Sequence, residues 1–222
     1  MPVPAAAVTV ILPCLNEALA LPSVLSRISS SYQVIVVDNG SADGSRKVAA
    51  EYGARVLLEP CLGYGAAVHT GVRAAVTDLV CILDADGSID PAVLPQLIEP
   101  LNAGGADLVI GRRRPTTYGA LPLHARWANA AVAARLRHCT SLRVRDLGAV
   151  RACRRQELLA LGVRDRRCGY PVELLVRAAH AGWTVVEIDV PYGRRTAGTR
   201  SKITGSLRGT LRTARDFSAV LP

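Results

Sequence analysis

Short apolar runs and longer segments of helical periodicity alternate along the first half of the chain. The apolar runs, which are typical of buried strands, lie at residues 8–12, 33–37, 55–58, 80–83 and 107–110. The segments between them, at 17–29, 45–49 and 63–75, indicate helices; in the first, apolar positions recur at Leu21, Val24, Leu25 and Ile28. This alternation predicts an α/β fold with a mainly parallel, Rossmann-like sheet and helices on both faces.

The second half of the chain is expected to extend the same unit. Its periodicity predicts helices at residues 91–101, 123–137, 154–161 and 171–181, and strands at 144–150 and 184–190. A last, basic helix is expected at about 201–217, where apolar residues at helical spacing alternate with arginines. Because no repeat, low-complexity tract or linker interrupts the chain, residues 1–222 are expected to form one domain.

Two carboxylates, Asp84 and Asp86, follow the apolar run at 80–83. Strand side chains alternate in direction, so both acids are expected on one side, just beyond the carboxyl end of a core strand. Ligands of open α/β sheets bind in that region, and a divalent cation such as Mg2+ or Mn2+ would relieve the repulsion between two such acids. The sequence Asp-Ala-Asp-Gly-Ser also suits a simple polar turn, so the metal interpretation needs support from other residues.

Polar residues also follow the first two strands. The first strand leads into Pro13–Glu17, and the second into Asp38–Ser41. In a parallel sheet these ends meet at one edge, so Glu17, Asp38, Asp84 and Asp86 are expected to cluster there. Asp38 could accept a hydrogen bond from a base or a ribose hydroxyl, although the segment 38–41 alone is also typical of a turn and a helix cap.

A glycine pair, Gly63 and Gly65, follows the third strand and opens a helix. With an acid about twenty residues on, at Asp84, this spacing mimics the dinucleotide-binding fingerprint. The third glycine is absent and the pair does not open the sheet, which argues against a nicotinamide cofactor. A loop of small residues that lets the backbone approach a ligand is the other interpretation.

Three motifs taken together, VTVILPCLNE at 8–17, VIVVDNGSADGS at 34–45 and DAD at 84–86, resemble family 2 glycosyltransferases of the GT-A fold. The resemblance continues through 108–112, 145–149, Glu173 and 190–202, and these later pieces are most similar to the polyprenyl-phosphate (dolichol-phosphate) mannosyl- and glucosyltransferase branch. It covers about residues 5–205. It implies an inverting transfer of a sugar from a UDP- or GDP-sugar with the help of Mg2+ or Mn2+.

The resemblance also implies roles for individual residues. The nucleoside pocket would be lined by Pro13, Asn16, Glu17, Asp38 and Ser41. Gly63 and Gly65 would pack near the nucleotide, and the Asp84-Ala85-Asp86 motif would hold the metal and the diphosphate, with Asp86 among the catalytic candidates. The phosphates of donor or acceptor would be faced by Arg112, Arg195, Ser201 and Lys202.

The chemistry of the acceptor decides whether a protein base is needed. A phosphate monoester has a second pKa of about 6, so at neutral pH it is already an anionic nucleophile. A sugar or alcohol hydroxyl needs a carboxylate base, and Glu173 and Asp146 are the candidates. Glu173 is also compatible with an ordinary solvated position on the helix expected at 171–181.

The chain carries a formal net charge of +9, almost all of it from arginine. Such a charge favours an anionic partner: a nucleotide, a phosphate, an anionic lipid or a nucleic acid. The acidic cluster argues against nucleic acid, because it would repel phosphates unless it held a metal. No apolar run approaches the ~18 residues that span a membrane, so we expect a cytoplasmic protein, with the basic segment 201–217 offering peripheral contact at the inner membrane face.

Three alternatives remain open at this point. The acceptor could be a soluble metabolite or glycan hydroxyl instead of a polyprenyl phosphate. A nucleotidyltransferase would use a similar sheet, but it usually has a glycine-rich, basic loop after the first strand, and residues 13–17 contain none. A basic binding module for nucleic acid would show binding that falls steeply with salt and does not respond to nucleotide-sugars.

Overall fold

A computed structural model describes residues 8–198 and 216–217 of the chain. Most of the helix expected at 201–217 lies outside the described residues, as do Ser201 and Lys202. None of the helices in the described part combines the length and the apolar character required to cross a membrane.

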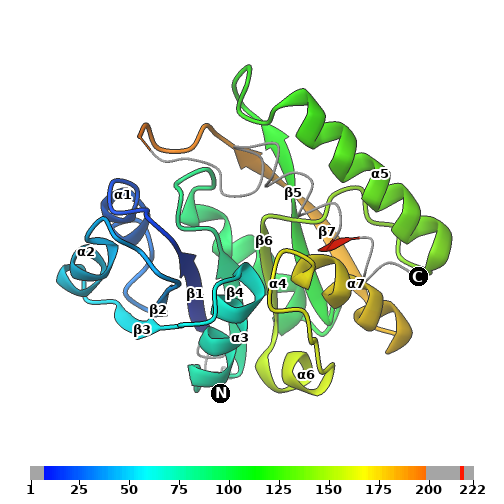
Figure 1. The fold of residues 1–222 in the computed structure, drawn as a ribbon. Helices are drawn as coiled ribbons and strands as arrows, with labels where there is room; N and C mark the ends of the chain where they lie inside the picture. The colour runs from blue at the N-terminus through cyan, green and yellow to red at the C-terminus, as the bar shows by residue number, and fades with distance from the viewer. Residues whose placement is uncertain (1–7, 199–215, 218–222) are drawn as a thin grey trace.

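Seven strands form one sheet in the order β3-β2-β1-β4-β6-β5-β7 (Figure 1). They are β1 (Val8–Cys14), β2 (Gln33–Asp38), β3 (Arg55–Leu58), β4 (Leu79–Leu83), β5 (Leu108–Pro115), β6 (Val150–Arg154) and β7 (Val185–Tyr192). The helices are α1 (Leu21–Leu25), α2 (Ser45–Glu51), α3 (Tyr64–Ala74), α4 (Leu94–Asn102), α5 (Leu123–Cys139), α6 (Arg155–Ala160) and α7 (Tyr170–His180), with a 3-10 turn η1 (Pro91–Val93) before α4.

Most neighbouring strands are parallel, which confirms the predicted fold class. The pairs β1–β2, β1–β4, β2–β3 and β5–β7 are parallel, and only β6 runs antiparallel to its two neighbours, β4 and β5. Consequently the carboxyl ends of β1, β2 and β4 lie side by side, as the sequence predicted. Residues 14 and 38, at the ends of β1 and β2, are register partners.

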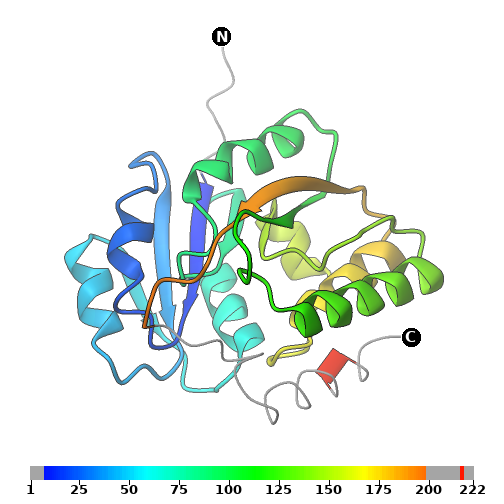
Figure 2. The ribbon, with the colours of Figure 1, turned by 90° about the horizontal axis from the view of Figure 1, so that it is seen from above.

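Helices cover both faces of the sheet (Figure 2). On one face, α1, α2 and α4 pack through residues such as Leu21, Ala49 and Leu97. On the other, α3, α6, α7 and part of α5 pack through residues such as Val68, Leu136, Leu158, Leu174 and Leu175. The strands supply both cores because their side chains alternate: Val10 and Leu12 face the first core and Ile11 faces the second.

Three elements differ from the sequence prediction. The strand expected at 144–150 is the strand β6, Val150–Arg154, and residues 144–149 form the loop before it. The helix expected at 17–29 is reduced to Leu21–Leu25, because residues 15–20 form turns. The strand β5 continues to Pro115, well past the expected end at 110, because it pairs with β7 as far as Tyr192.

Candidate functional site

The loops after β1 and β2 are joined to each other by hydrogen bonds. The backbone amide of Asn16 donates to Ser41 Oγ at 2.9 Å, and Asn16 Oδ1 accepts from the amide of Ala42 at 2.8 Å. Asn16 adopts a left-handed backbone conformation with φ 53°, which asparagine tolerates better than most residues. These contacts fix the two loops relative to one another, so the edge of the sheet presents a preformed surface.

Two acids at these strand ends, Asp38 and Glu17, are buried. Asp38 accepts from the amide of Ser41 at 3.3 Å, and Arg46 Nε lies 3.7 Å from Asp38 Oδ2. Glu17 is also buried, and its amide donates to Ser45 Oγ at 2.9 Å. Pro13, the next-to-last residue of β1, pairs in register with Val37. The structure therefore brings together the residues expected around the nucleoside, namely Pro13, Asn16, Glu17, Asp38 and Ser41.

Asp84 and Asp86 follow β4 with Ala85 between them. Ala85 is buried in the apolar core, whereas Asp84 remains partly exposed and Asp86 is buried with 2% of its surface exposed. Asp86 Oδ1 accepts from the amide of Ser88 at 2.9 Å. Burial, and then the neighbouring Asp86 carboxylate, raise the pKa of Asp84 to about 6. The Asp86 carboxylate is thus close enough to disfavour the charge on Asp84.

The segment after β7 closes over this pair of acids. The amide of Thr196 donates to the Asp86 carbonyl at 3.0 Å, and the amide of Gly193 donates to the Ser88 carbonyl at 2.7 Å. This pairing places Arg195 Nη1 2.9 Å from Asp86 Oδ2, an ion-pair contact whose angles do not make it a hydrogen bond. Burial alone would lower the pKa of Arg195. The nearby negative charges, with Asp86 the strongest among them, outweigh burial, and the pKa is raised. The structure therefore places Arg195 at the acidic pair.

Arg113, and not the predicted Arg112, is the arginine of β5 directed to the site. Arg112 lies 3.7 Å from Asp189 on β7, on the same side of the strand as Arg114, which binds that acid at 2.8 Å. Arg113 points to the opposite side and is near enough to Asp84 to lower its pKa. Arg112, which was expected to face a phosphate, is paired in the structure with Asp189. Side chains alternate along a strand, so Arg112 and Arg113 must point to opposite sides of β5. The sequence does not show which side of β5 faces the site.

Asp146, a predicted base, holds Arg113 in place. Arg113 Nη2 and Nε donate to Asp146 Oδ1 and Oδ2 at 2.6 and 3.0 Å, and the Arg113 amide donates to Oδ2 at 2.9 Å. Burial alone would raise the pKa of Asp146, but these bonds lower it. Asn129 Oδ1 adds a further acceptor for Arg113 Nη2 at 3.0 Å. Asp146 therefore lies close to the site but is already engaged in an ion pair.

A third arginine near Asp84, Arg151, is buried and was not expected from the sequence. Its side chain donates to Tyr64 Oη at 3.1 Å and to the carbonyls of Leu147 and Gly148. Its positive charge lowers the pKa of Asp84, opposing the effect of burial. A buried arginine near the start of a short antiparallel strand carries no sequence signal that distinguishes it from an exposed one.

Gly63 and Gly65 make room for another part of the chain. A side chain at Gly63 would clash with the Arg166 carbonyl, and a Cβ at Gly65 would lie 2.5 Å from the Asp165 carbonyl oxygen. The amides of Gly65 and Ala66 donate to the carbonyls of Arg167 and Arg166 at 2.9 and 2.8 Å. The small residues are therefore required by the loop 165–167, whereas the expectation placed them against the nucleotide.

Glu173, the other predicted base, braces that same loop. Its carboxylate accepts from the amides of Arg164 at 3.0 Å and Asp165 at 2.6 Å, and from Arg177 Nε at 2.5 Å. Burial would raise the pKa of Glu173, but these hydrogen bonds lower it. Its hydrogen bonds and its ion pair engage the loop 164–165 and Arg177 instead of Asp84 or Asp86.

The acidic pair fits a divalent cation that shares its ligands with a phosphate. Within residues 8–198 and 216–217, no group of three or more His, Cys, Asp or Glu side chains is arranged to hold a metal alone. Mg2+ commonly uses only one or two carboxylates together with substrate phosphates and water. The raised pKa of Asp84 and the oxygen-only donors of Asp84 and Asp86 match that type of site.

Comparison with known proteins gives consistent results. The family model described as glycosyl transferase family 2 matches residues 9–158. An uncharacterized glycosyltransferase of Mycobacterium tuberculosis is 54% identical over 215 residues, which cover 97% of this chain and 98% of the relative. A dolichyl-phosphate hexose transferase of Haloferax volcanii is 31% identical over 188 residues, covering 83% of this chain and 82% of the relative.

The fold also resembles a solved enzyme. The crystal structure of glucosyl-3-phosphoglycerate synthase from Mycobacterium tuberculosis, in complex with Mn2+, UDP and glucosyl-3-phosphoglycerate, superposes with a TM-score of 0.75 at 25% identity. The superposition covers 97% of this chain and 78% of that enzyme.

Proposed function

The chain belongs to glycosyl transferase family 2, and we propose that it transfers a hexose, with inversion, from a UDP- or GDP-sugar to a polyprenyl phosphate. The solved neighbour with Mn2+ and UDP supports the donor class. The dolichyl-phosphate hexose transferase among the relatives supports the acceptor class. The observation that carries the proposal is the meeting of Asp84 and Asp86 with Arg195 and Arg113 at one edge of the sheet.

The joined loops after β1 and β2 would bind the nucleoside. Asp38 is the candidate acceptor for a hydroxyl or base donor, and its burial beside Arg46 fixes its position. Asn16 and Ser41 hold the two loops in register and so define the shape of the pocket.

The leaving diphosphate would lie against the acidic pair and the arginines. A cation held by Asp84 and Asp86, the two acids of a DXD motif, would supply Lewis-acid stabilisation of the charge that grows on the leaving oxygen. Arg195 and Arg113 add fixed positive charge there, in partly buried positions where its effect is strengthened. Asp146 and Asn129 keep the Arg113 side chain in one orientation.

The state of the two candidate bases favours an acceptor that is already anionic. Asp146 and Glu173 each accept at least three hydrogen bonds, and those bonds lower the pKa of both carboxylates. Such groups are weak bases at neutral pH. A phosphate monoester with its second pKa near 6 needs no base, so it fits this site better than a hydroxyl does.

A soluble acceptor is the second candidate. The solved neighbour is a glucosyl-3-phosphoglycerate synthase, and it covers nearly all of this chain. A phosphorylated metabolite would meet the same arginines as a lipid phosphate, so the two candidates differ in the rest of the acceptor.

The test is a transfer assay that separates these acceptors. Purified protein is incubated with Mn2+ and radiolabelled UDP-glucose or GDP-mannose, and with a polyprenyl phosphate, the polyprenyl alcohol of equal length, or 3-phosphoglycerate. We expect label in the polyprenyl phosphate alone, and at least a hundredfold less with Asp86→Asn, which removes a metal ligand.

Transfer to 3-phosphoglycerate alone would support the second candidate. A folded protein that neither transfers sugar nor gains thermal stability from any nucleotide with Mn2+ would contradict both. A nucleotide at about 100 times its dissociation constant should add about 2.7 kcal/mol of stability.

A further inference from the structure

The outer side of α5 and the loop before it expose several large apolar side chains. Tyr118, Leu123 and Trp127 are 94%, 65% and 76% exposed. Of the residues of this long helix only Ala133 and Leu136 are buried. The helix lies along the periphery of the molecule, beside β5 and β7 (Figures 1 and 2).

Four exposed apolar residues of α5 form a stripe that faces away from the protein core. At 100° per residue, Leu123, Trp127, Ala130 and Ala134 fall on the side opposite Leu136. All four are exposed. A helix on an ordinary solvated surface turns its polar side outward, whereas this helix turns an apolar side outward.

Basic side chains border this stripe on both sides. Arg126 and Arg137 lie along one edge, His138, His124 and Arg135 lie along the other, and all five are exposed. The sequence from residue 108 to residue 145 contains eight arginines and not one aspartate or glutamate. At the end of α5, Arg137, Arg143 and Arg145 also line a hollow of about 760 Å3.

We propose that the outer side of α5, together with Tyr118, is a docking surface for an anionic phospholipid bilayer. Tryptophan and tyrosine favour the boundary between headgroups and acyl chains, and arginines attract anionic headgroups. An apolar stripe with basic edges is the pattern of a helix that lies in the membrane interface. A second copy of the chain fits poorly, because a twofold contact through this surface would bring its arginines against each other.

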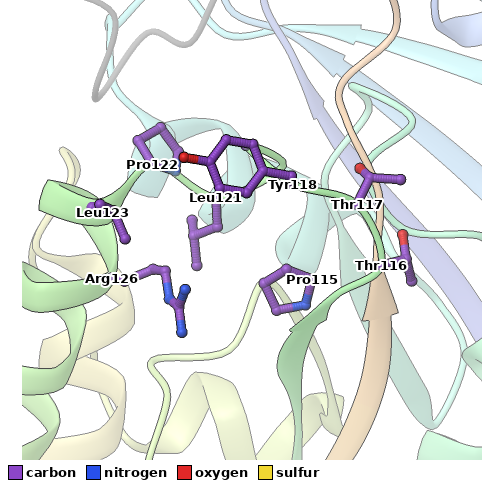
Figure 3. A pocket seen from close by; sticks show the side chains of 9 residues that line it. Pro115, Thr116, Thr117, Tyr118, Leu121, Pro122, Leu123 and Arg126 are labelled. Atoms are coloured by element: carbon purple, nitrogen blue, oxygen red, sulfur yellow. The ribbon is translucent and has the colours of Figure 1, made fainter.

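The docking surface is continuous with the candidate site. Arg194 Nη2 donates to the Tyr118 carbonyl at 2.8 Å, and the next residue, Arg195, contacts Asp86. A pocket of about 520 Å3 lies between the Tyr118 loop and the start of α5, with Leu121 and Arg126 in its lining (Figure 3). If the proposed function holds, docking would bring the site to the surface where a polyprenyl phosphate resides; docking itself does not depend on that function.

The test is vesicle flotation of the full chain without donor, acceptor or metal. Vesicles of phosphatidylcholine alone are compared with vesicles containing about 30% phosphatidylglycerol, a content of anionic lipid sufficient to attract basic segments. We expect binding to the anionic vesicles that weakens with salt. Trp127→Ala should weaken it about tenfold, as expected for the loss of one buried aromatic side chain.

Matched variants distinguish a specific docking surface from the general effect of losing any exposed apolar side chain or any positive charge. Leu58→Ala removes an exposed apolar side chain from β3, at the opposite edge of the sheet, and should leave binding unchanged. Lys47→Gln removes one positive charge from exposed α2 and should matter less than Arg126→Gln. Equal losses from Trp127→Ala and Leu58→Ala would overturn the proposal.

A second readout follows Trp127 directly. The chain has two tryptophans, so Trp183→Phe leaves Trp127 as the single indole fluorophore. We expect its emission to shift to shorter wavelength on anionic vesicles and to be quenched by brominated lipid. Unchanged emission would overturn the proposal. So would absent vesicle binding together with a dimer, seen by sedimentation, that Trp127→Ala dissociates. Neither result depends on sugar transfer, so failure of docking and failure of the proposed function are distinguishable.

Discussion

Asp146 and Glu173 are both carboxylates whose oxygens are engaged by arginine and by backbone amides. Each accepts charge-assisted hydrogen bonds, which stabilise the ionised form and lower the pKa of both groups despite their burial. A general base works best when its pKa is near the working pH. Their geometry therefore suits residues that position other groups: Asp146 positions Arg113, and Glu173 positions the loop 164–167.

Asp146→Asn is expected to lower the free energy of unfolding by about 2 kcal/mol at pH 7, because it weakens charged hydrogen bonds to Arg113. The folded-state pKa of Asp146 is lowered. Its stabilisation is therefore complete above the ordinary pKa of about 3.9 and is lost as the pH falls through the folded-state value. Urea denaturation at pH 7 and pH 3 measures this: the difference between the two proteins should be smaller at pH 3 than at pH 7. Asp189→Asn, in an exposed ion pair, is the control and should change little.

Glu173→Gln is expected to leave kcat within a few-fold of the wild type, because an amide oxygen can still accept from the loop amides. Loss of a general base would instead lower kcat by roughly a hundredfold to ten-thousandfold. Steady-state kinetics with the acceptor identified in the transfer assay gives the answer. A thousandfold loss in a variant of unchanged thermal stability would make Glu173 the base.

At the scale of elements, the start of α3 is built around its contact with the loop 165–167. Gly65→Ala would place a methyl group 2.5 Å from the Asp165 carbonyl and 2.9 Å from Tyr170 Cβ. We expect about 1–3 kcal/mol of destabilisation, as for other overpacked sites. Gly105→Ala is the control, because the nearest atom to its new methyl group lies at 3.7 Å. Chemical denaturation of both variants measures the difference, and equal midpoints would contradict the packing argument.

The strands that carry the acids were predictable, and β6 was not. β1, β2 and β4 are buried parallel strands, so they appear in the sequence as continuous apolar runs with polar residues at their ends. The strand β6 has Arg151 as its second residue and Arg154 at its end, and the sequence favoured the segment just before it. Arg151 becomes compatible with burial only through Tyr64 and two loop carbonyls, which are distant or irregular partners that periodicity cannot show.

The same limit applies to the arginines of the site. Arg112 alone of the run 112–114 was expected to face a phosphate, but which member of the run faces Asp84 depends on the pairing of β5 with β6 and β7. The glycines at 63 and 65 were recognised as needed for a close approach. The approaching backbone, however, is a loop a hundred residues further along the chain.

For the whole molecule, the two halves of the chain carry opposite charge. The first hundred residues contain five basic and ten acidic residues, and the remainder contains 22 basic and eight acidic residues. The candidate site lies where these halves meet: the acids after β4 come from the first half, and Arg113, Arg151 and Arg195 come from the second. The arginines offset part of the repulsion between Asp84 and Asp86, and the raised pKa of Asp84 shows that part of it remains.

This remaining repulsion should make the stability of the whole molecule depend on pH and metal together. A carboxyl whose folded pKa is raised to about 6 binds its proton more tightly in the folded state, so without metal its cost grows from about pH 4 to pH 6 and is constant above. Asp84→Asn should therefore raise the metal-free free energy of unfolding at pH 7, by about 1 kcal/mol given the partial exposure of the side chain.

In the wild type, Mn2+ with the preferred nucleotide should raise Tm at pH 7.5, and this increase should shrink as the pH falls through about 6, because protons and metal compete for Asp84. Scanning calorimetry from pH 5 to pH 8 measures both effects. A metal-dependent increase in Tm that is equal at pH 5 and pH 8, or that persists in Asp84→Asn, would show that the metal is held elsewhere.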